Sequence, residues 1–283
     1  MGVDLCGIAL DHPVINGSGT FDVIAARRAF GASLDDNFPF SAFVSKTITL
    51  QPRLGNPPPR LFETPSGLIN SIGLPNRGLD GYLEHDLPEL ARLSVPLITN
   101  VMGSTADEVG QLFEALESRD EIAAIELNVS CPNVKTGLDI GSDPAELSKL
   151  LAAVRPKTSK PLIVKLTPNT ANVGLVASAA EESGADAVSL INTLRAYAPS
   201  PNQASSAWLG GGTGGQSGPA IRAVALAQTA SVAKAVVIPI IAMGGIERAE
   251  HARQFIELGA RLVAVGTSSF RDPLAASRIR DSL

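Results

Sequence analysis

The most reactive side chain in this sequence is a thiol in a loop of amides. Cys131 lies in the segment NVSCPN, residues 128–133, directly after a short apolar run. A thiol between two carboxamides and ahead of a proline can act as an acid, a base or a nucleophile. A free cysteine more often packs as a small buried hydrophobe, which is what we expect of Cys6, the only other cysteine. The polar loop around Cys131 favours a catalytic role.

Two lysines also end apolar runs. Lys46 follows SAFVS and Lys165 follows PLIV. Lysine is rarely buried without a partner, so we expect both to face an anionic group. Two other roles are open: Lys165 could form a Schiff base, and either lysine could extend to the rim and stay solvated.

Carboxamides recur at the ends of the runs and in the loops that follow them. They supply hydrogen-bond donors and acceptors without charge, which suits a planar ring of alternating C=O and N–H groups. A single Asn is more often a turn or cap residue, so it is their clustering that indicates a binding site. The set is Asn70, Asn100, Asn128, Asn133 and Asn192.

Glycines follow the last two apolar runs. Gly244-Gly245 and Gly266-Thr267 stand where backbone N–H groups can approach an anion closely, beside Ser217-Gly218 from the preceding loop. A following helix would add its dipole. These positions predict a phosphate-binding corner.

Eight apolar runs must position these residues. Most are followed by a stretch of helical composition, as in a parallel sheet buried on both faces. We therefore predict an α/β fold, a single (β/α)8 TIM barrel over residues 1–283, with its chemistry at the carboxyl ends of the strands. The runs are residues 13–16, 41–45, 95–99, 123–127, 161–164, 187–191, 238–243 and 261–265.

Helices and long loops alternate with these runs. Helical spacing predicts helices over 106–116, after the Asp143-Pro144 cap, over 172–183, after Gly218-Pro219 and over 247–258. Three stretches are too long for simple connections, and each follows the carboxyl end of a strand. We expect them as inserted loops on the functional face: Thr49–Gly78, Val129–Pro144 and Leu194–Pro219.

Composition excludes several classes. The net charge of −5 without a basic run argues against nucleic acid, and the apolar runs are too short to cross a membrane. No secretion signal begins the chain, and two cysteines form no metal-ligand pattern or disulfide framework, so we expect a cytoplasmic protein. His12, His85 and His251 fall away from the strand ends, and no catalytic histidine is predicted.

Longer motifs carry a resemblance. They include SGTF (18–21), SKTITLQPRLGNPPPR (45–60), ETPSGLINSIGLPN (63–76) and ELNVSCPNVKTG (126–137), followed by VKLTPN, SLINTL, SGPAI, IIAMGGI and VGTSSF. From Pro13 to Pro273 the chain resembles the class 1 dihydroorotate dehydrogenases. It is most similar to the catalytic subunit of the B type, which works with an iron–sulfur flavoprotein.

The resemblance implies FMN-dependent oxidation of (S)-dihydroorotate to orotate in pyrimidine biosynthesis. Cys131 would remove the C5 proton while hydride passes from C6 to FMN N5. The implied substrate-binding residues are Lys46, Asn70, Ser71, Ile72, Gly73, Leu74, Asn128, Asn192 and Thr193. The implied cofactor-binding residues are Ser18, Lys46, Thr47, Asn100, Asn128, Lys165, Ile191, Gly218, Gly244, Gly245, Gly266 and Thr267.

Partners and alternatives complete the expectations. A homodimer is typical of the family, and any iron–sulfur centre would lie on another chain because this one lacks the cysteines. The acceptor could be NAD through that partner, or fumarate. Residues 196–214 are nearly uncharged, unlike the more charged stretch expected of a B type. The alternatives are a related flavin barrel acting on dihydrouracil or dihydrothymine, a Schiff-base lyase using Lys165, and a non-catalytic phosphate-binding barrel.

Overall fold

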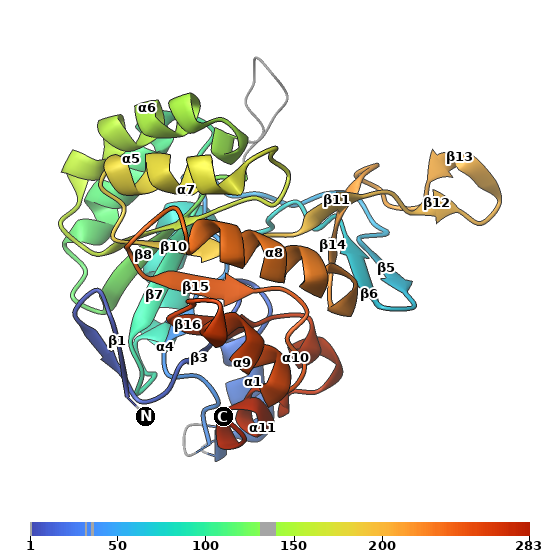
Figure 1. The fold of residues 1–283 in the computed structure, drawn as a ribbon, viewed down its shortest axis with the longest axis horizontal. Helices are drawn as coiled ribbons and strands as arrows, with labels where there is room; N and C mark the ends of the chain where they lie inside the picture. The colour runs from blue at the N-terminus through green and yellow to red at the C-terminus, as the bar shows by residue number, and fades with distance from the viewer. Residues whose placement is uncertain (1, 32, 35–36, 131–139) are drawn as a thin grey trace.

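An eight-stranded parallel sheet rolled into a barrel forms the centre of the molecule (Figure 1). The structure, a computed structural model, describes residues 2–31, 33–34, 37–130 and 140–283. The strand order is β3-β16-β15-β10-β9-β8-β7-β4, and every adjacent pair is parallel. The predicted (β/α)8 barrel is confirmed. Its strands are β3 (Val14–Asn16), β4 (Phe43–Val44), β7 (Leu97–Val101), β8 (Ile122–Asn128), β9 (Leu162–Lys165), β10 (Ala187–Leu190), β15 (Ile240–Met243) and β16 (Leu262–Val265).

A buried side chain helps to close the barrel between β3 and β4. The Asn16 Nδ2 donates to the Val44 carbonyl at 2.8 Å, and the Val44 N–H donates to Asn16 Oδ1 at 2.8 Å. The Ser41 N–H adds a bond to the Val14 carbonyl at 3.0 Å. The Asn16 amide therefore takes the place of a peptide unit in the ladder, which satisfies both of its polar ends in the interior.

The helices surround the barrel, and the predicted ones are present, several with a side-chain cap. Asp143 accepts from the Ala145 N–H at 2.8 Å ahead of Pro144, and Asn172 accepts from the Leu175 N–H at 3.2 Å, which fixes where each helix begins. The helices are α1 (Val23–Phe30), α3 (Gly78–Gly81), α4 (Leu87–Leu90), α5 (Ala106–Glu117), α6 (Pro144–Val154), α7 (Val173–Glu182), α8 (Arg222–Val232), α9 (Ala249–Glu257), α10 (Ser268–Arg271) and α11 (Ala275–Asp281). Shorter turns are η1 (Tyr82–Asp86), η2 (Ile140–Ser142), η3 (Arg155–Lys157) and η4 (Pro219–Ile221).

Apolar side chains pack on both faces of each strand. On β9, Leu162 and Val164 belong to the large core that includes helical residues, whereas Ile163 belongs to a smaller core that contains no helical residue. Alternate residues of a strand point to opposite faces, so the smaller core fills the barrel interior. Two residues further along β7, β8, β9 and β10, and just beyond the end of β4, the interior becomes polar. That polar layer contains Lys46, Asn100, Glu126, Lys165 and Ser189, each buried except Lys46.

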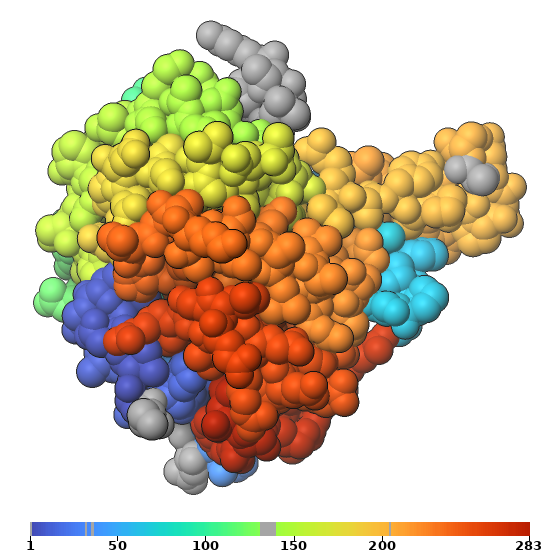
Figure 2. All heavy atoms as spheres, in the orientation of Figure 1, coloured from blue at the N-terminus to red at the C-terminus, as the bar shows by residue number. Residues whose placement is uncertain are grey.

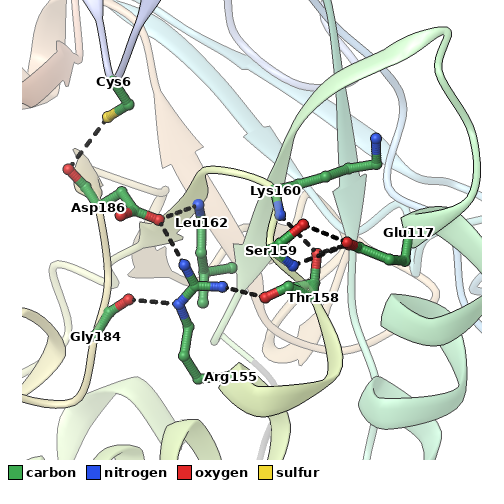
Figure 3. A network of polar contacts seen from close by, with 9 residues as sticks. All are labelled: Cys6, Glu117, Arg155, Thr158, Ser159, Lys160, Leu162, Gly184 and Asp186. Atoms are coloured by element: carbon green, nitrogen blue, oxygen red, sulfur yellow. Dashed lines mark hydrogen bonds and ion pairs between the residues drawn. The ribbon is translucent and has the colours of Figure 1, made fainter.

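The amino-terminal end of the barrel is covered. A hairpin of β1 (Val3–Leu5) and β2 (Ile8–Leu10) adds Leu5 and Leu10 to the interior core. Around it lies a network of hydrogen bonds and ion pairs centred on Arg155, Asp186 and Glu117 (Figure 3). The carboxyl end is therefore the open one.

Two predicted inserted loops combine into one sheet. Residues 49–78 supply β5 (Leu61–Thr64) and β6 (Gly67–Asn70), and residues 194–219 supply β11 (Leu194–Ala196) and β14 (Gly214–Ser217). Their order is β11-β14-β6-β5, all antiparallel, with Asn70 paired to Gly215. Beyond it, β12 (Pro199–Ser200) and β13 (Gln203–Ala207) form an arm that extends away from the barrel (Figures 1 and 2).

Candidate active site

A cavity of about 620 Å³ opens where the strands end, a volume suited to a small ligand or cofactor. Strand ends of the barrel and the inserted sheet both contribute to its wall. The structure brings most of the predicted site residues together there. These are Ser18, Lys46, Thr47, Asn70, Ile72, Gly73, Leu74, Asn128, Lys165, Ile191, Asn192, Thr193, Gly218, Gly244, Gly245, Gly266 and Thr267.

Two predicted residues are not on this wall, and two others lie outside the described residues. Ser71 is buried and its hydroxyl accepts from Asn56 Nδ2 at 2.9 Å. Asn100 is fully buried and its Nδ2 donates to the Glu126 carboxylate. Cys131 lies outside the described residues, as does Asn133; Ser130, which precedes Cys131 in the chain, is on the wall.

The wall is cationic. Lys165 is only 6% exposed, whereas Lys46 is accessible from the cavity that it lines. Burial by the surrounding protein, and then the nearby charge of Lys165, lower the pKa of Lys46. Among the described wall residues there is no Asp or Glu. A bound anion would stabilise the charged form of Lys46, so the cavity favours an anionic ligand.

The carboxamides orient one another at one side of the cavity. Asn192 Nδ2 donates to Ser130 Oγ at 2.9 Å and to Asn128 Oδ1 at 3.3 Å. Asn192 Oδ1 accepts from the Thr193 N–H at 2.8 Å, and Asn70 Nδ2 donates to the Gly215 carbonyl at 3.2 Å. The amides are thus held in place before any ligand binds, as recognition of a planar polar ring requires.

The glycines form a cradle, but for different reasons. Gly244 has φ 135°, and a Cβ there would lie 2.6 Å from the Ala225 Cβ, so its backbone demands glycine. Gly266 has φ outside the left-handed region, and a Cβ there would meet only the Thr20 side chain at 3.5 Å. The protein itself leaves room at Gly266, which is the condition for close approach of a ligand to the backbone.

A buried histidine supports this cradle from behind. His251 on α9 lies with its Nδ1 3.1 Å from Arg222 Nη1, which also donates to the Gly245 carbonyl at 3.2 Å. Burial, Arg222 and Arg248 lower the pKa of His251. The neutral ring of His251 therefore orients Arg222 beneath the glycine loop. The position of His251 within a predicted helix did not indicate this structural role.

These features fit a flat cofactor with an anionic tail. The two lysines and the glycine cradle can bind anionic groups. The buried Asn100 Oδ1 has no hydrogen-bond partner among the described atoms and can accept from an N–H or O–H group. Within the described residues no cluster of three or more His, Cys, Asp or Glu could hold a metal.

Comparison with known proteins decides the family. The sequence profile described as "Dihydroorotate dehydrogenase" matches residues 1–283. The chain belongs to the dihydroorotate dehydrogenase family. It is therefore an oxidoreductase, and the Schiff-base lyase interpretation is wrong.

Relatives within the family are similar over nearly their whole length. A protein of Citrifermentans bemidjiense is 44% identical over 99% of this chain and 90% of its own length. Proteins of Geotalea uraniireducens and Bacillus pumilus are each 43% identical over the whole chain and 92% and 90% of their own lengths. All three are named dihydroorotate dehydrogenase B (NAD(+)), catalytic subunit.

The site contains residues that the family motifs did not single out. Met102 and Ser130 lie three residues beyond the ends of predicted strands, and Met243 is the last residue of another. All three line the wall, a position that strand periodicity could have indicated. Leu61 and Phe270 form part of the mouth and are each more than half exposed. No helix within the described ranges is long and apolar enough to cross a bilayer.

Proposed function

We propose that the protein oxidises dihydroorotate to orotate with bound FMN, as one domain over residues 1–283. The observation that carries this proposal is the cavity, which gathers two lysines, an amide cluster and a glycine cradle at the carboxyl ends of the strands. The names of the relatives support the same substrate.

The cavity divides naturally between two ligands. The glycine cradle with Thr267 would hold the FMN phosphate, and Lys165 would neutralise negative charge on the reduced flavin ring. Lys46 would contact both flavin and substrate carboxylate. The pyrimidine ring would meet Asn70, Ile72, Gly73, Leu74, Asn128, Asn192 and Thr193, while Ser18, Thr47, Asn100 and Ile191 would complete the flavin site.

Cys131 is proposed as the base. Its thiolate takes the C5 proton of dihydroorotate onto Sγ as the C5–C6 double bond forms. FMN, when bound, supplies the acceptor for the C6 hydride. Because C5–H is only weakly acidic, the carboxamides and Lys46 must hold the ring close to the thiolate and keep water away.

Dihydrouracil and dihydrothymine are less suited to this cavity. Neither carries a carboxylate, and Lys46 would then lie on the wall with its positive charge unmatched. We expect orotate to compete with dihydroorotate and inhibit flavin reduction, and we expect uracil not to do so.

A second chain is proposed as electron carrier. The relatives are named as catalytic subunits of NAD(+) enzymes, and the two cysteines here cannot ligate an iron–sulfur cluster, which takes four thiolates. We propose that an iron–sulfur flavoprotein passes electrons to NAD, and that the catalytic chain is a cytoplasmic homodimer.

The test is anaerobic reduction of the flavin. Dihydroorotate should bleach the yellow protein. Cys131→Ala should retain FMN, but the rate at which dihydroorotate bleaches it should fall by several orders of magnitude. Cys6→Ser is the matched control, because Cys6 lies at the end of the barrel opposite the cavity; this variant should be bleached at the wild-type rate. Wild-type protein that binds FMN but is not bleached would overturn the proposal.

A further inference from the structure

A buried carboxylate lies in the barrel interior beneath the cavity. Glu126 on β8 is 2% exposed. Its Oε1 accepts from Ser189 Oγ on β10 at 2.7 Å, and its Oε2 accepts from Asn100 Nδ2 on β7. Ser189 and Asn100 are themselves fully buried. One side chain thus links three strands through two hydrogen bonds.

The carboxylate decides which way the Asn100 amide faces. A carboxylate offers only acceptors, so the amide must present its NH₂ group to Glu126. Its oxygen, Oδ1, therefore points elsewhere, and it has no partner among the described atoms. A buried acceptor left unpaired is unfavourable, and a hydrogen-bond donor that arrives with a ligand would remove that cost.

The surroundings of Asn100 indicate what brings that donor. The Ile48 N–H donates to the Asn100 carbonyl at 3.0 Å, so the segment that carries Lys46 runs alongside. Three neighbours of this region line the cavity: Lys46, Met102, which is two residues after Asn100, and Asn128, which is two residues after Glu126. Asn100 lies directly behind that wall, at the part of it assigned to the flavin.

We propose that Glu126 is a positioning residue, which fixes the Asn100 amide so that Oδ1 accepts a hydrogen bond from an N–H or O–H group of the bound flavin. The inference rests on the proposed function. Glu126 itself contacts neither cofactor nor substrate; it acts through Asn100, and Ser189 holds its second oxygen.

Exchanging donor and acceptor tests this pairing. Glu126→Gln can donate to Asn100 Oδ1 and so allows the amide to turn over, while Asn100→Asp sets two carboxylates side by side. In the double variant the amide introduced on β8 donates to the carboxylate introduced on β7, whose other oxygen is again an acceptor. The measurement is the Kd for FMN of the flavin-free protein, from quenching of flavin fluorescence.

We expect each single variant to bind FMN roughly tenfold or more weakly and the double variant to return to within about threefold of wild type. Glu117→Gln, the same substitution at the amino-terminal end, should leave the Kd unchanged. A purely structural role for Glu126 predicts no such recovery. If Glu126→Gln does not fold, tighter binding by the double variant than by Asn100→Asp alone still tests the pairing.

The outcomes separate the two proposals. Wild-type binding of FMN with an unchanged Kd in Glu126→Gln, or no recovery in the double variant, overturns the positioning role alone. A wild-type protein that does not bind FMN overturns the proposed function and this inference with it.

Discussion

The two ends of the barrel use similar polar residues in opposite ways. At the amino-terminal end, Arg155 donates to the Gly184 and Thr158 carbonyls at 2.8 and 2.6 Å and to Asp186 at 3.2 Å. Asp186 also accepts from the Leu162 N–H at 2.8 Å (Figure 3). At the carboxyl end, the buried Asn100 Oδ1 has no partner among the described atoms. Completed networks stabilise the fold, whereas incomplete ones are available to a ligand.

Concavity alone does not distinguish these ends. A hollow of about 500 Å³ also lies at the amino-terminal end, lined by Asp4, Cys6, Ser159, Pro161, Asp186 and Pro239. Burial, with the charges of Asp186 and Asp4, raises the pKa of Cys6 to about 11, and its thiol donates to the Asp186 carbonyl at 3.2 Å. This thiol stays protonated near neutral pH and is a poor nucleophile. What differs is the chemistry left unsatisfied.

The largest expected effect comes from replacing one lysine at each end of the barrel, Lys46 at the cavity and Lys160 at the amino-terminal end. Lys46→Met removes a cation from the cavity and should lower kcat/KM for dihydroorotate by about 10²–10³-fold. Its Tm should not fall, because the loss of hydration that lowers the pKa of the Lys46 ammonium already disfavours the charge. Lys160→Met removes bonds to the Arg119 and Ile122 carbonyls at 2.9 and 3.0 Å and should cost about 1–2 kcal/mol of stability.

Steady-state kinetics and thermal unfolding of both variants check that Lys46→Met loses activity and Lys160→Met loses stability. Lys160→Met should keep the wild-type kcat/KM per folded molecule. A Lys46→Met variant with near-normal kcat/KM would show that the carboxylate does not bind there.

The strands and most of the wall could be predicted because they depend on local pattern. Val, Ile and Leu runs form strands buried on both faces, and the residue after each run reaches the rim. Asn100 was placed at that rim, but β7 continues to Val101, so Asn100 lies inside the barrel and Met102 takes the wall. Glu126 was missed because it stands within a run interpreted as apolar.

The inserted sheet could not be predicted in detail. Its strands are only three or four residues long, and the pairing of Asn70 with Gly215 joins segments far apart in the sequence. Such a register is set by tertiary contacts rather than by propensity. Ser71 was expected on the wall with its neighbours, but its side chain faces Asn56 instead.

Two glycine substitutions should separate a glycine that the fold requires from one that leaves room for a ligand. Gly244→Ala forces a Cβ to 2.6 Å from Ala225 at φ 135° and should lower the Tm by several degrees. Gly266→Ala meets only an ordinary 3.5 Å contact, so its Tm should be near wild type. The same methyl group would obstruct a phosphate and should weaken FMN binding roughly tenfold. Unchanged FMN affinity in Gly266→Ala would remove this residue from the phosphate site.

The smallest effect concerns pH at the amino-terminal end. Hydrogen bonds from Ser159, including its N–H at 3.0 Å, and from Thr158 Oγ1 at 2.5 Å lower the pKa of Glu117 from 4.5 to about 2. The unfolded chain binds the proton first, so this stabilisation is complete above pH 4.5 and is lost as the pH falls towards 2. Solvent screening reduces its size to about 1 kcal/mol. Urea unfolding of wild type and Glu117→Gln between pH 7 and pH 3 should therefore converge in acid, while FMN affinity at pH 7 stays equal. Parallel stability curves for the two proteins would mean that the Glu117 carboxylate contributes nothing to the closed end of the barrel.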